Sequence, residues 1–243
     1  MVILGKMKIQ TFASSSKANC YQISDSKTTI IIESGMSLKK LFKLPDFDIS
    51  KISGVLISHS HADHSAYCQD FLKFGISCFM TLETAEALNL EKNNIGIEII
   101  EPKKTFKIGS FTIKPFETQH DCAGSVGFWI KSVTENKRLV FATDTFYLKQ
   151  VFSKINYYMI ECNYDAEILN KNIELGIIDG CRAKRLKSSH FSLQNVIEFF
   201  KAQDLSVCEK IQLLHLSNEN ADAELFKTEI QKLTGVPVEI ARA

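Results

Sequence analysis

The segment from Ser58 to His64 reads Ser-His-Ser-His-Ala-Asp-His and continues a β-type run that begins at Ile52. In extended backbone, alternate side chains share a face, so His59, His61 and Asp63 can point together while His64 points to the other side. Imidazole and carboxylate groups are good ligands for zinc and similar ions. The segment therefore predicts two adjacent metal ions, one held by His59 and His61 and the other by Asp63 and His64.

Three further candidate ligands stand near the ends of later β-type runs. His120 follows residues 111–117, Asp144 follows residues 139–143, and His215 lies near the end of residues 211–216. Each residue alone would be an ordinary loop residue. A terminal carboxylate, however, gives an isolated core strand no advantage. We therefore expect these three residues to complete the set of metal donors.

Size and charge limit the classes of protein that the chain can belong to. Its 243 residues, 45% of them hydrophobic, are enough for one substantial core, and we predict a single domain over residues 1–243. The 29 basic and 28 acidic residues give a net charge of +1. No global field would draw the chain onto nucleic acid or a membrane, so any such attraction must be local.

The cysteines and the N-terminus indicate the compartment. The seven cysteines are odd in number, lie far apart and form no CxxC pair, which predicts buried, reduced thiols. The apolar stretch at residues 1–4 is too short for a signal peptide or a membrane span. We therefore expect a cytoplasmic protein with no membrane partner.

The hydrophobic patterning predicts an α/β protein. We expect strands at residues 7–13, 19–24, 28–33, 52–58, 77–80, 111–117, 126–133, 138–143, 157–161 and 211–216. We expect helices at residues 38–42, 165–173, 192–202 and 221–233. This order fits two sheets covered by helices on the outside, although a simple parallel sheet also remains open.

The HxHxDH segment, followed by a later His, a later Asp and a final His, resembles the metallo-β-lactamase superfamily. The resemblance spans nearly the whole chain and implies a four-layer αβ/βα sandwich with the metals at one edge. It implies that one ion is held by His59, His61 and His120, that the other is held by Asp63, His64 and His215, and that Asp144 bridges them.

Within that superfamily the chain is similar to the YycJ/WalJ branch, whose members are regarded as DNA exonucleases. The similarity lies in the stretches 14–21, 118–121, 142–145, 161–165 and 215–220. Two stretches depart from the pattern of the branch: Glu33-Ser34-Gly35 replaces the usual Asp-X-Gly, and residues 15–19 replace a loop richer in glycine. The resemblance implies nucleic acid as substrate, with DNA preferred to RNA.

Two ions would share a hydroxide formed at neutral pH, and this hydroxide would be the nucleophile. Asp63 can orient it or accept its proton, and both ions can polarise the bond under attack. The carboxylate of Asp144 argues against a true β-lactamase, because those enzymes usually carry Cys or Ser at that position. Zinc is the first expectation for the two divalent ions, with manganese or iron as alternatives.

His190 is the one histidine outside this ligand set. Its order after Glu161 and before His215 is similar to the layout in tRNA 3′-processing endonucleases, where a glutamate and a histidine assist the leaving group. We predict the same pair here, because a histidine beside a carboxylate can protonate the departing oxygen of a phosphodiester. The alternative is a solvated neighbour of a helix cap formed by Ser189 or Ser192.

Possible substrate contacts flank these residues. Arg182, Lys184, Arg185 and Lys187 place four cations within six positions, either as a phosphate-binding patch or as a solvated helix face. Of these, Arg185 and Lys187 are the predicted contacts. Ser217 and Asn218 could bind phosphate oxygens or bases, or satisfy the backbone of their own loop.

The prediction from sequence is therefore a dinuclear metal-dependent phosphodiesterase, and specifically an exonuclease. One alternative is a carboxyl-ester hydrolase acting on thioesters or lactones, similar to glyoxalase II, because the same centre attacks a carbonyl carbon. Another is a scaffold protein that retains the fold, which the complete ligand set disfavours. The sequence leaves the oligomeric state open.

Overall fold

The computed structural model describes residues 7–91 and 94–241, so the apolar stretch at residues 1–4 lies outside the described residues. The chain divides into two compact units. Of the described residues, unit 1 contains 7–91, 94–117 and 122–138, and unit 2 contains 118–121 and 139–241. The prediction of one domain stays a prediction.

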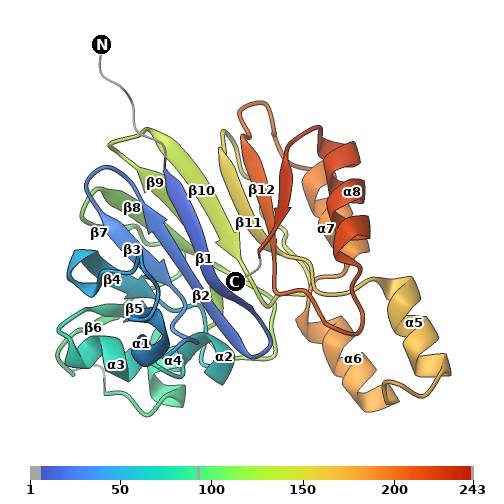
Figure 1. The fold of residues 1–243 in the computed structure, drawn as a ribbon, viewed down its shortest axis with the longest axis horizontal. Helices are drawn as coiled ribbons and strands as arrows, with labels where there is room; N and C mark the ends of the chain where they lie inside the picture. The colour runs from blue at the N-terminus through green and yellow to red at the C-terminus, as the bar shows by residue number, and fades with distance from the viewer. Residues whose placement is uncertain (1–6, 92–93, 242–243) are drawn as a thin grey trace. The chain divides into compact units, whose positions relative to one another are not determined.

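The main sheet of unit 1 follows the order of the sequence. Its strands are β1 (Lys8–Ser15), β2 (Ala18–Ser24), β3 (Thr29–Ile32), β4 (Ile52–Leu56), β5 (Cys78–Met80) and β6 (Ile97–Ile99), in the spatial order β1 to β6 (Figure 1). The pairs β1–β2 and β2–β3 are antiparallel, and the pairs from β3 to β6 are parallel. Its central strands are apolar and buried, as Ile30, Ile31 and Ile32 illustrate.

Short helices cover the hydrophobic side of this sheet. Unit 1 contains α1 (Leu38–Leu41), the 3-10 turn η1 (Ile49–Lys51), α2 (Ala62–Ser65), α3 (Cys68–Lys73) and α4 (Leu82–Ala87). Leu41 of α1, Phe71 of α3 and Ala85 of α4 share one core with Val55 of β4. The antiparallel strands β7 (Phe106–Ile108), β8 (Phe111–Glu117) and β9 (Val126–Ser132) complete unit 1.

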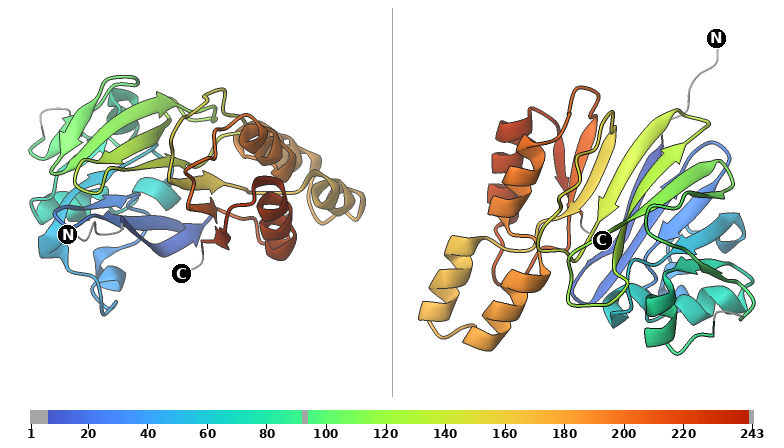
Figure 2. Two further views of the ribbon diagram at one scale, coloured as in Figure 1. Left: turned by 90° about the horizontal axis from the view of Figure 1, so that it is seen from above. Right: turned by 180° about the vertical axis from the view of Figure 1, so that it is seen from behind.

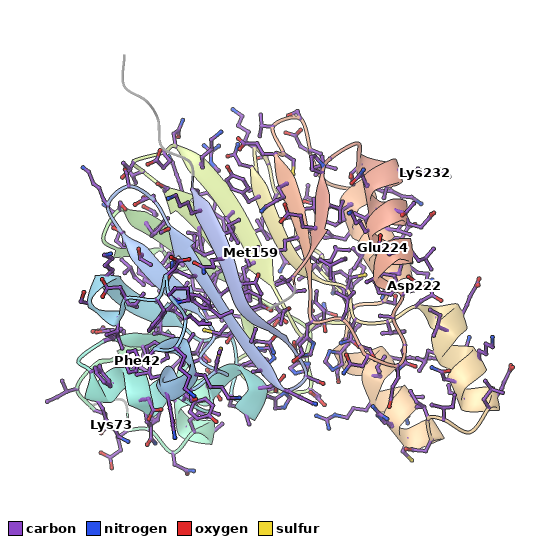
Figure 3. The ribbon with its side chains drawn as sticks, in the orientation of Figure 1. Phe42, Lys73, Met159, Asp222, Glu224 and Lys232 are labelled. Carbon is purple, nitrogen blue, oxygen red and sulfur yellow. The ribbon has the colours of Figure 1, made fainter. Side chains whose placement is uncertain are left out.

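Unit 2 is a parallel sheet with helices. Its strands are β10 (Lys137–Ala142, of which residues 139–142 belong to this unit), β11 (Tyr157–Glu161), β12 (Lys210–Leu214) and β13 (Val238–Ile240). Met159, labelled in Figure 3, lies fully buried on β11. The helices are α5 (Ala166–Glu174), α6 (Gly180–Ser189), α7 (Leu193–Lys201) and α8 (Ala223–Thr234); α5 contacts α6, and α7 contacts α8 (Figure 2).

Side-chain caps explain where the helices of unit 2 begin. Asp165, Asp179, Ser192 and Asp222 each accept hydrogen bonds from backbone amides in the first turn of α5, α6, α7 and α8. These bonds satisfy amides that have no partner within a helix. None of the helices described within residues 7–91 and 94–241 has the length and apolar character needed to cross a membrane.

All ten predicted β-type runs are strands whose ends agree within two residues, and the four predicted helices are present. The backbone prediction for the histidine segment is partly wrong. His61 is extended, with φ −61° and ψ 143°, but Asp63 and His64 lie in α2 and not in extended chain. The burial prediction holds for Cys20, Cys68, Cys78 and Cys162. It is wrong for Cys181, which is exposed, and for Cys122 and Cys208, which are only half-buried.

Candidate metal centre

The first donor group of unit 1 begins where β4 ends. His59 is fully buried and His61 is half-buried. His59 Nε2 lies 3.2 Å from His61 Nδ1, and Ser58 Oγ lies 2.8 Å from His59 Nδ1. Two nitrogens bound tetrahedrally to one zinc ion at about 2.0–2.1 Å would lie about 3.3 Å apart. The spacing of this pair therefore fits a shared metal ion.

The second donor group of unit 1 lies one helical turn later. Asp63 Oδ2 lies 3.1 Å from His64 Nε2. The fully buried amide of Asn19 donates to Asp63 Oδ2 at 3.2 Å, and its Nδ2 lies 3.1 Å from His64 Nε2. Asn19 thus positions both donors. Sequence reasoning gave it no role, because 44 residues separate it from Asp63.

Glu33 lies behind the second donor group. Its Oε1 is 3.6 Å from His64 Nδ1, and its Oε2 accepts a hydrogen bond from the Ser58 amide at 3.3 Å. Burial raises the pKa of Glu33, and the neighbouring His64 and Ser58 oppose that rise. A carboxylate on one ring nitrogen orients a metal-binding histidine and leaves its other nitrogen for the metal. Here that other nitrogen, Nε2, faces Asp63.

Gly35 allows the backbone to pass close to the backbones of Asp63 and Asn19. A Cβ at position 35 would lie 1.8 Å from the Asp63 carbonyl oxygen and 2.8 Å from the Asn19 amide nitrogen. The Gly35 amide donates to the Asn19 carbonyl at 3.0 Å. Only a residue without a side chain fits here.

The donors of unit 2 gather at one edge because β10, β11 and β12 are parallel. The carboxyl ends of parallel strands meet at the same edge, where α/β proteins place their ligands. Glu161 ends β11, Asp144 follows β10 and His215 follows β12. Asp144, Glu161, His190 and His215 each offer one donor atom, and these four atoms lie within 4.8 Å of one another.

His120 joins this group. Its Nδ1 lies 3.0 Å from the Ser189 carbonyl oxygen, and its Nε2 lies 3.7 Å from Asp144 Oδ2. A carbonyl can only accept, so Nδ1 carries the proton and the neutral ring presents its lone pair at Nε2. Burial lowers the pKa of His120, which favours this neutral form, although Asp144, Asp121 and Glu161 oppose the shift.

Asp144 and His215 hold an uncommon backbone conformation. Their φ angles are 46° and 55°, in the left-handed region, where non-glycine residues are rare. His215 Nδ1 lies 3.5 Å from Asp144 Oδ1, and Asn163 Nδ2 donates to the His215 carbonyl at 2.7 Å. Such conformations cost about 1–3 kcal/mol and cluster at functional sites.

Glu161 and His190 form the shortest of these contacts, with 2.6 Å between Glu161 Oε1 and His190 Nδ1. Glu161 Oε2 accepts hydrogen bonds from the Thr145 and Phe191 amides at 3.0 and 3.2 Å. Burial alone would lower the pKa of His190, but the charge and hydrogen bond of Glu161 outweigh it and raise the pKa. The sequence prediction of a Glu161–His190 pair thus has a matching contact.

The predicted substrate contacts mostly have protein partners. Arg185 Nε donates to Asp121 Oδ2 at 2.9 Å, and Lys187 Nζ donates to Asn170 Oδ1 at 3.1 Å. Ser217 Oγ accepts from the Glu219 and Asn220 amides at 3.3 and 3.2 Å. Asn218 is exposed. Arg185 lies beside the donors of unit 2 through Asp121, whose Oδ1 is 3.3 Å from His120 Nε2.

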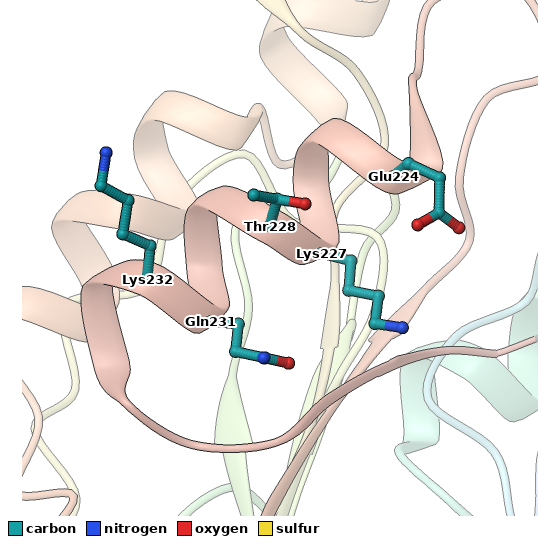
Figure 4. A pocket seen from close by; sticks show the side chains of 5 residues that line it. All are labelled: Glu224, Lys227, Thr228, Gln231 and Lys232. Atoms are coloured by element: carbon teal, nitrogen blue, oxygen red, sulfur yellow. The ribbon is translucent and has the colours of Figure 1, made fainter.

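A hollow elsewhere in unit 2 contains none of these donors. It has a volume of about 490 Å³ and is lined by side chains of α8 alone, namely Glu224, Lys227, Thr228, Gln231 and Lys232 (Figure 4). One acidic and two basic side chains line it, and no histidine is among them. The chemistry of unit 2 therefore lies at the strand ends.

The fold and the clustered donors define a class of protein, and the family comparison identifies it. The family model described as the beta-lactamase superfamily domain matches residues 28–204, and the chain belongs to this family. It is a metal-dependent hydrolase of the metallo-β-lactamase fold, so the predicted α/β fold class is confirmed.

Two curated relatives and one solved structure are similar over most of the chain. Exodeoxyribonuclease WalJ of Streptococcus pneumoniae (strain R6) is 27% identical over 90% of this chain and 84% of its own length. Exodeoxyribonuclease YycJ of Bacillus anthracis is 24% identical over 93% and 89%. The metallo-β-lactamase fold protein YhfI of Bacillus subtilis has a TM-score of 0.75 at 16% identity, covering 97% of this chain and 96% of that one. The predicted YycJ/WalJ resemblance is confirmed.

Proposed function

We propose that this chain is a dinuclear metal-dependent phosphodiesterase that degrades DNA from its ends. The observation that carries the proposal is the 2.6 Å contact between Glu161 and His190 within a group of metal donors. A phosphodiester releases an alkoxide that needs a proton, and a histidine held by a carboxylate can supply it. The two relatives are both named exodeoxyribonucleases, which supports DNA as substrate.

The proposed metal ligands follow the order of the family motif along the chain. We assign His59, His61 and His120 to one ion, Asp63, His64 and His215 to the other, and Asp144 to both. The nitrogen and carboxylate donors suit zinc, with manganese or iron as alternatives. Bound divalent ions would supply Lewis acid catalysis on the phosphoryl oxygen and make water a better nucleophile at neutral pH.

The protein's own groups would orient the reactants and move protons. Asp63, fixed by Asn19, would orient the attacking water and accept its proton. His190 would donate a proton to the leaving oxygen, and Glu161 would hold the ring in place. The phosphates of the DNA would be contacted by Arg185 and Lys187. Its phosphate oxygens or bases would be contacted by Ser217 and Asn218.

Hydrolysis assays with zinc or manganese test the proposal. The substrates are bis-p-nitrophenyl phosphate, end-labelled single- and double-stranded DNA and RNA, and a thioester and a lactone. We expect the wild type to digest DNA and His61→Ala to be inactive. A metal-loaded wild type that hydrolyses the thioester or lactone but no phosphodiester would replace the proposal with carboxyl-ester hydrolysis, which the named relatives do not favour.

A further inference from the structure

A hollow of about 370 Å³ lies within unit 1 beside Asp63. Its lining comes from the β1–β2 turn, the start of α1, and the α2–α3 connection, and it includes Ser16, Lys17, Ser37, Lys40, Asp63 and Tyr67. Asp63 is a proposed metal ligand and the base of the proposed reaction. A substrate group bound in this hollow would therefore lie next to the bond that is cleaved.

The charge of the hollow suits a phosphate. Lys17 and Lys40 are exposed and supply its two cations, and the single carboxylate in its lining is Asp63. In the part of the chain that the structure describes, neither lysine has an ion pair with a carboxylate. Most other lysines of unit 1 with known partners, such as Lys51 and Lys104, are neutralised three residues away along the chain. No carboxylate of the described residues therefore competes with a phosphate for Lys17 or Lys40.

The hollow also contains an aromatic surface. Tyr67 is 38% exposed, and its backbone amide is fixed by the Ser34 carbonyl at 3.0 Å. Among residues 7–91 and 94–241, no other aromatic ring stacks on it. An exposed ring on a fixed backbone beside two lysines is the combination that binds single-stranded nucleic acid, because a base stacks on the ring while cations hold the backbone.

We propose that this hollow is a nucleotide subsite for single-stranded DNA, in which Tyr67 stacks one unpaired base and Lys17 and Lys40 hold its phosphate. The inference rests on the proposed function and deepens it. A base can stack on Tyr67 only after leaving the duplex, so the subsite makes single-stranded or frayed ends the preferred substrate. Its volume lies in the range of small-molecule pockets, which suits one nucleotide.

A neighbouring hollow supplies matched controls. It is lined by Leu38, Lys39, Phe42, Asp70, Lys73 and Phe74, of which Figure 3 labels Phe42 and Lys73. Lys39 adjoins Lys40 in the sequence but lines this second hollow, and Phe74 is an exposed ring there. Lys39→Ala and Phe74→Ala therefore remove the same kinds of group from outside the subsite.

The test measures the dissociation constant of the metal-loaded full chain for a fluorescent phosphorothioate oligonucleotide by anisotropy, over a series of salt concentrations. We expect Tyr67→Ala to weaken binding about tenfold or more and Tyr67→Phe to restore it. We expect the double variant Lys17→Gln/Lys40→Gln to weaken binding and to reduce the slope of log affinity against log salt by about 1.4. Both controls should bind as the wild type does.

The outcomes separate this inference from the proposed function. If the wild type digests single-stranded DNA while the Tyr67 and lysine variants keep its affinity and salt slope, the subsite is refuted and the nuclease remains. If the wild type hydrolyses no phosphodiester, the proposed function fails first. The exposed positions make folded variants the expectation, and circular dichroism of each variant checks this.

Discussion

Glu161 Oε1 contacts two histidine rings at once, His190 at 2.6 Å and His215 at 3.2 Å, and the rings are stacked with centroids 5.5 Å apart. Burial and the charge of Asp144 would raise the pKa of Glu161, but the attraction of His190 and the hydrogen bonds lower it overall. A single buried carboxylate thus connects the proposed proton donor to a proposed metal ligand.

The role of His190 can be tested through the leaving group. We expect His190→Ala to lower kcat on DNA about 10²- to 10⁴-fold, because an alkoxide needs a proton. The loss on bis-p-nitrophenyl phosphate should be much smaller, because p-nitrophenolate leaves without one. Steady-state kinetics on both substrates, with metal content measured in parallel, make the comparison. Equal losses on both would assign His190 to metal binding or structure.

Asn19 should control metal affinity. Its amide donates to Asp63 and contacts His64, so we expect Asn19→Ala to weaken metal binding about 10- to 100-fold. Tyr21→Phe is the matched comparison, because it keeps the Asn19 amide and removes a hydroxyl that donates to Asn19 Oδ1 at 3.0 Å and lies 2.8 Å from Ser14 Oγ. Titration with a competing zinc chelator gives both affinities. An unchanged affinity in Asn19→Ala would show that Asp63 and His64 hold their places without it.

Asp25 should make the free energy of unfolding depend on pH. Burial would raise its pKa, but hydrogen bonds from Ser132 and Ser110 outweigh that effect and lower the pKa below 3.8. A lowered folded pKa stabilises the fold above the unfolded pKa, and this contribution disappears as pH falls through the folded value. We expect Asp25→Asn to cost about 1–3 kcal/mol at pH 7 and progressively less below pH 3.8.

Urea unfolding of the chelated protein, at pH values from neutral to 3, measures this difference. The comparison with wild type at each pH removes the contribution of the other acids. A difference that stays constant across the range would mean that the Asp25 charge has no part in stability.

Gly35 should tolerate no side chain. A Cβ would meet the Asp63 carbonyl at 1.8 Å, so we expect Gly35→Ala to cost about 1–3 kcal/mol or more and to weaken metal binding. Gly180→Ala is the control, because a Cβ at the start of α6 meets nothing within 4 Å. Thermal unfolding of both variants tests the contrast. A Gly35→Ala protein as stable as wild type would contradict the close approach.

The sequence predicts those parts of the molecule that have a repeating or dense local pattern. Strands such as β8 and β11 are rich in aromatic and β-branched residues, and their bounds agree with prediction. The sequence does not predict α6, because six of the ten residues of Gly180–Ser189 are Arg, Lys or Ser and leave no apolar stripe. The α2 turn was missed because four residues are too few to show a helical period.

The sequence likewise predicts some residues of the candidate site and not others. His59, His61, Asp63 and His64 are visible because they are neighbours in the sequence. Asn19, Glu33 and Asn163 orient donors from far along the chain, and no spacing marks them. Arg185 and Lys187 are predicted contacts because of their charge and their place just before His190 in the sequence. Their partners depend on tertiary structure, since Asp121 lies 64 residues before Arg185.

The left-handed conformations of Asp144 and His215 lower the stability of the fold, whereas the side chains of these residues serve the proposed activity. Glycine would adopt the same backbone at either position without the steric cost of a Cβ. A laboratory screen that selects for heat resistance without assaying turnover would therefore favour glycine at positions 144 and 215, which removes both side chains. Thermostable variants of this protein should be sought only with an activity readout, or with both codons held fixed.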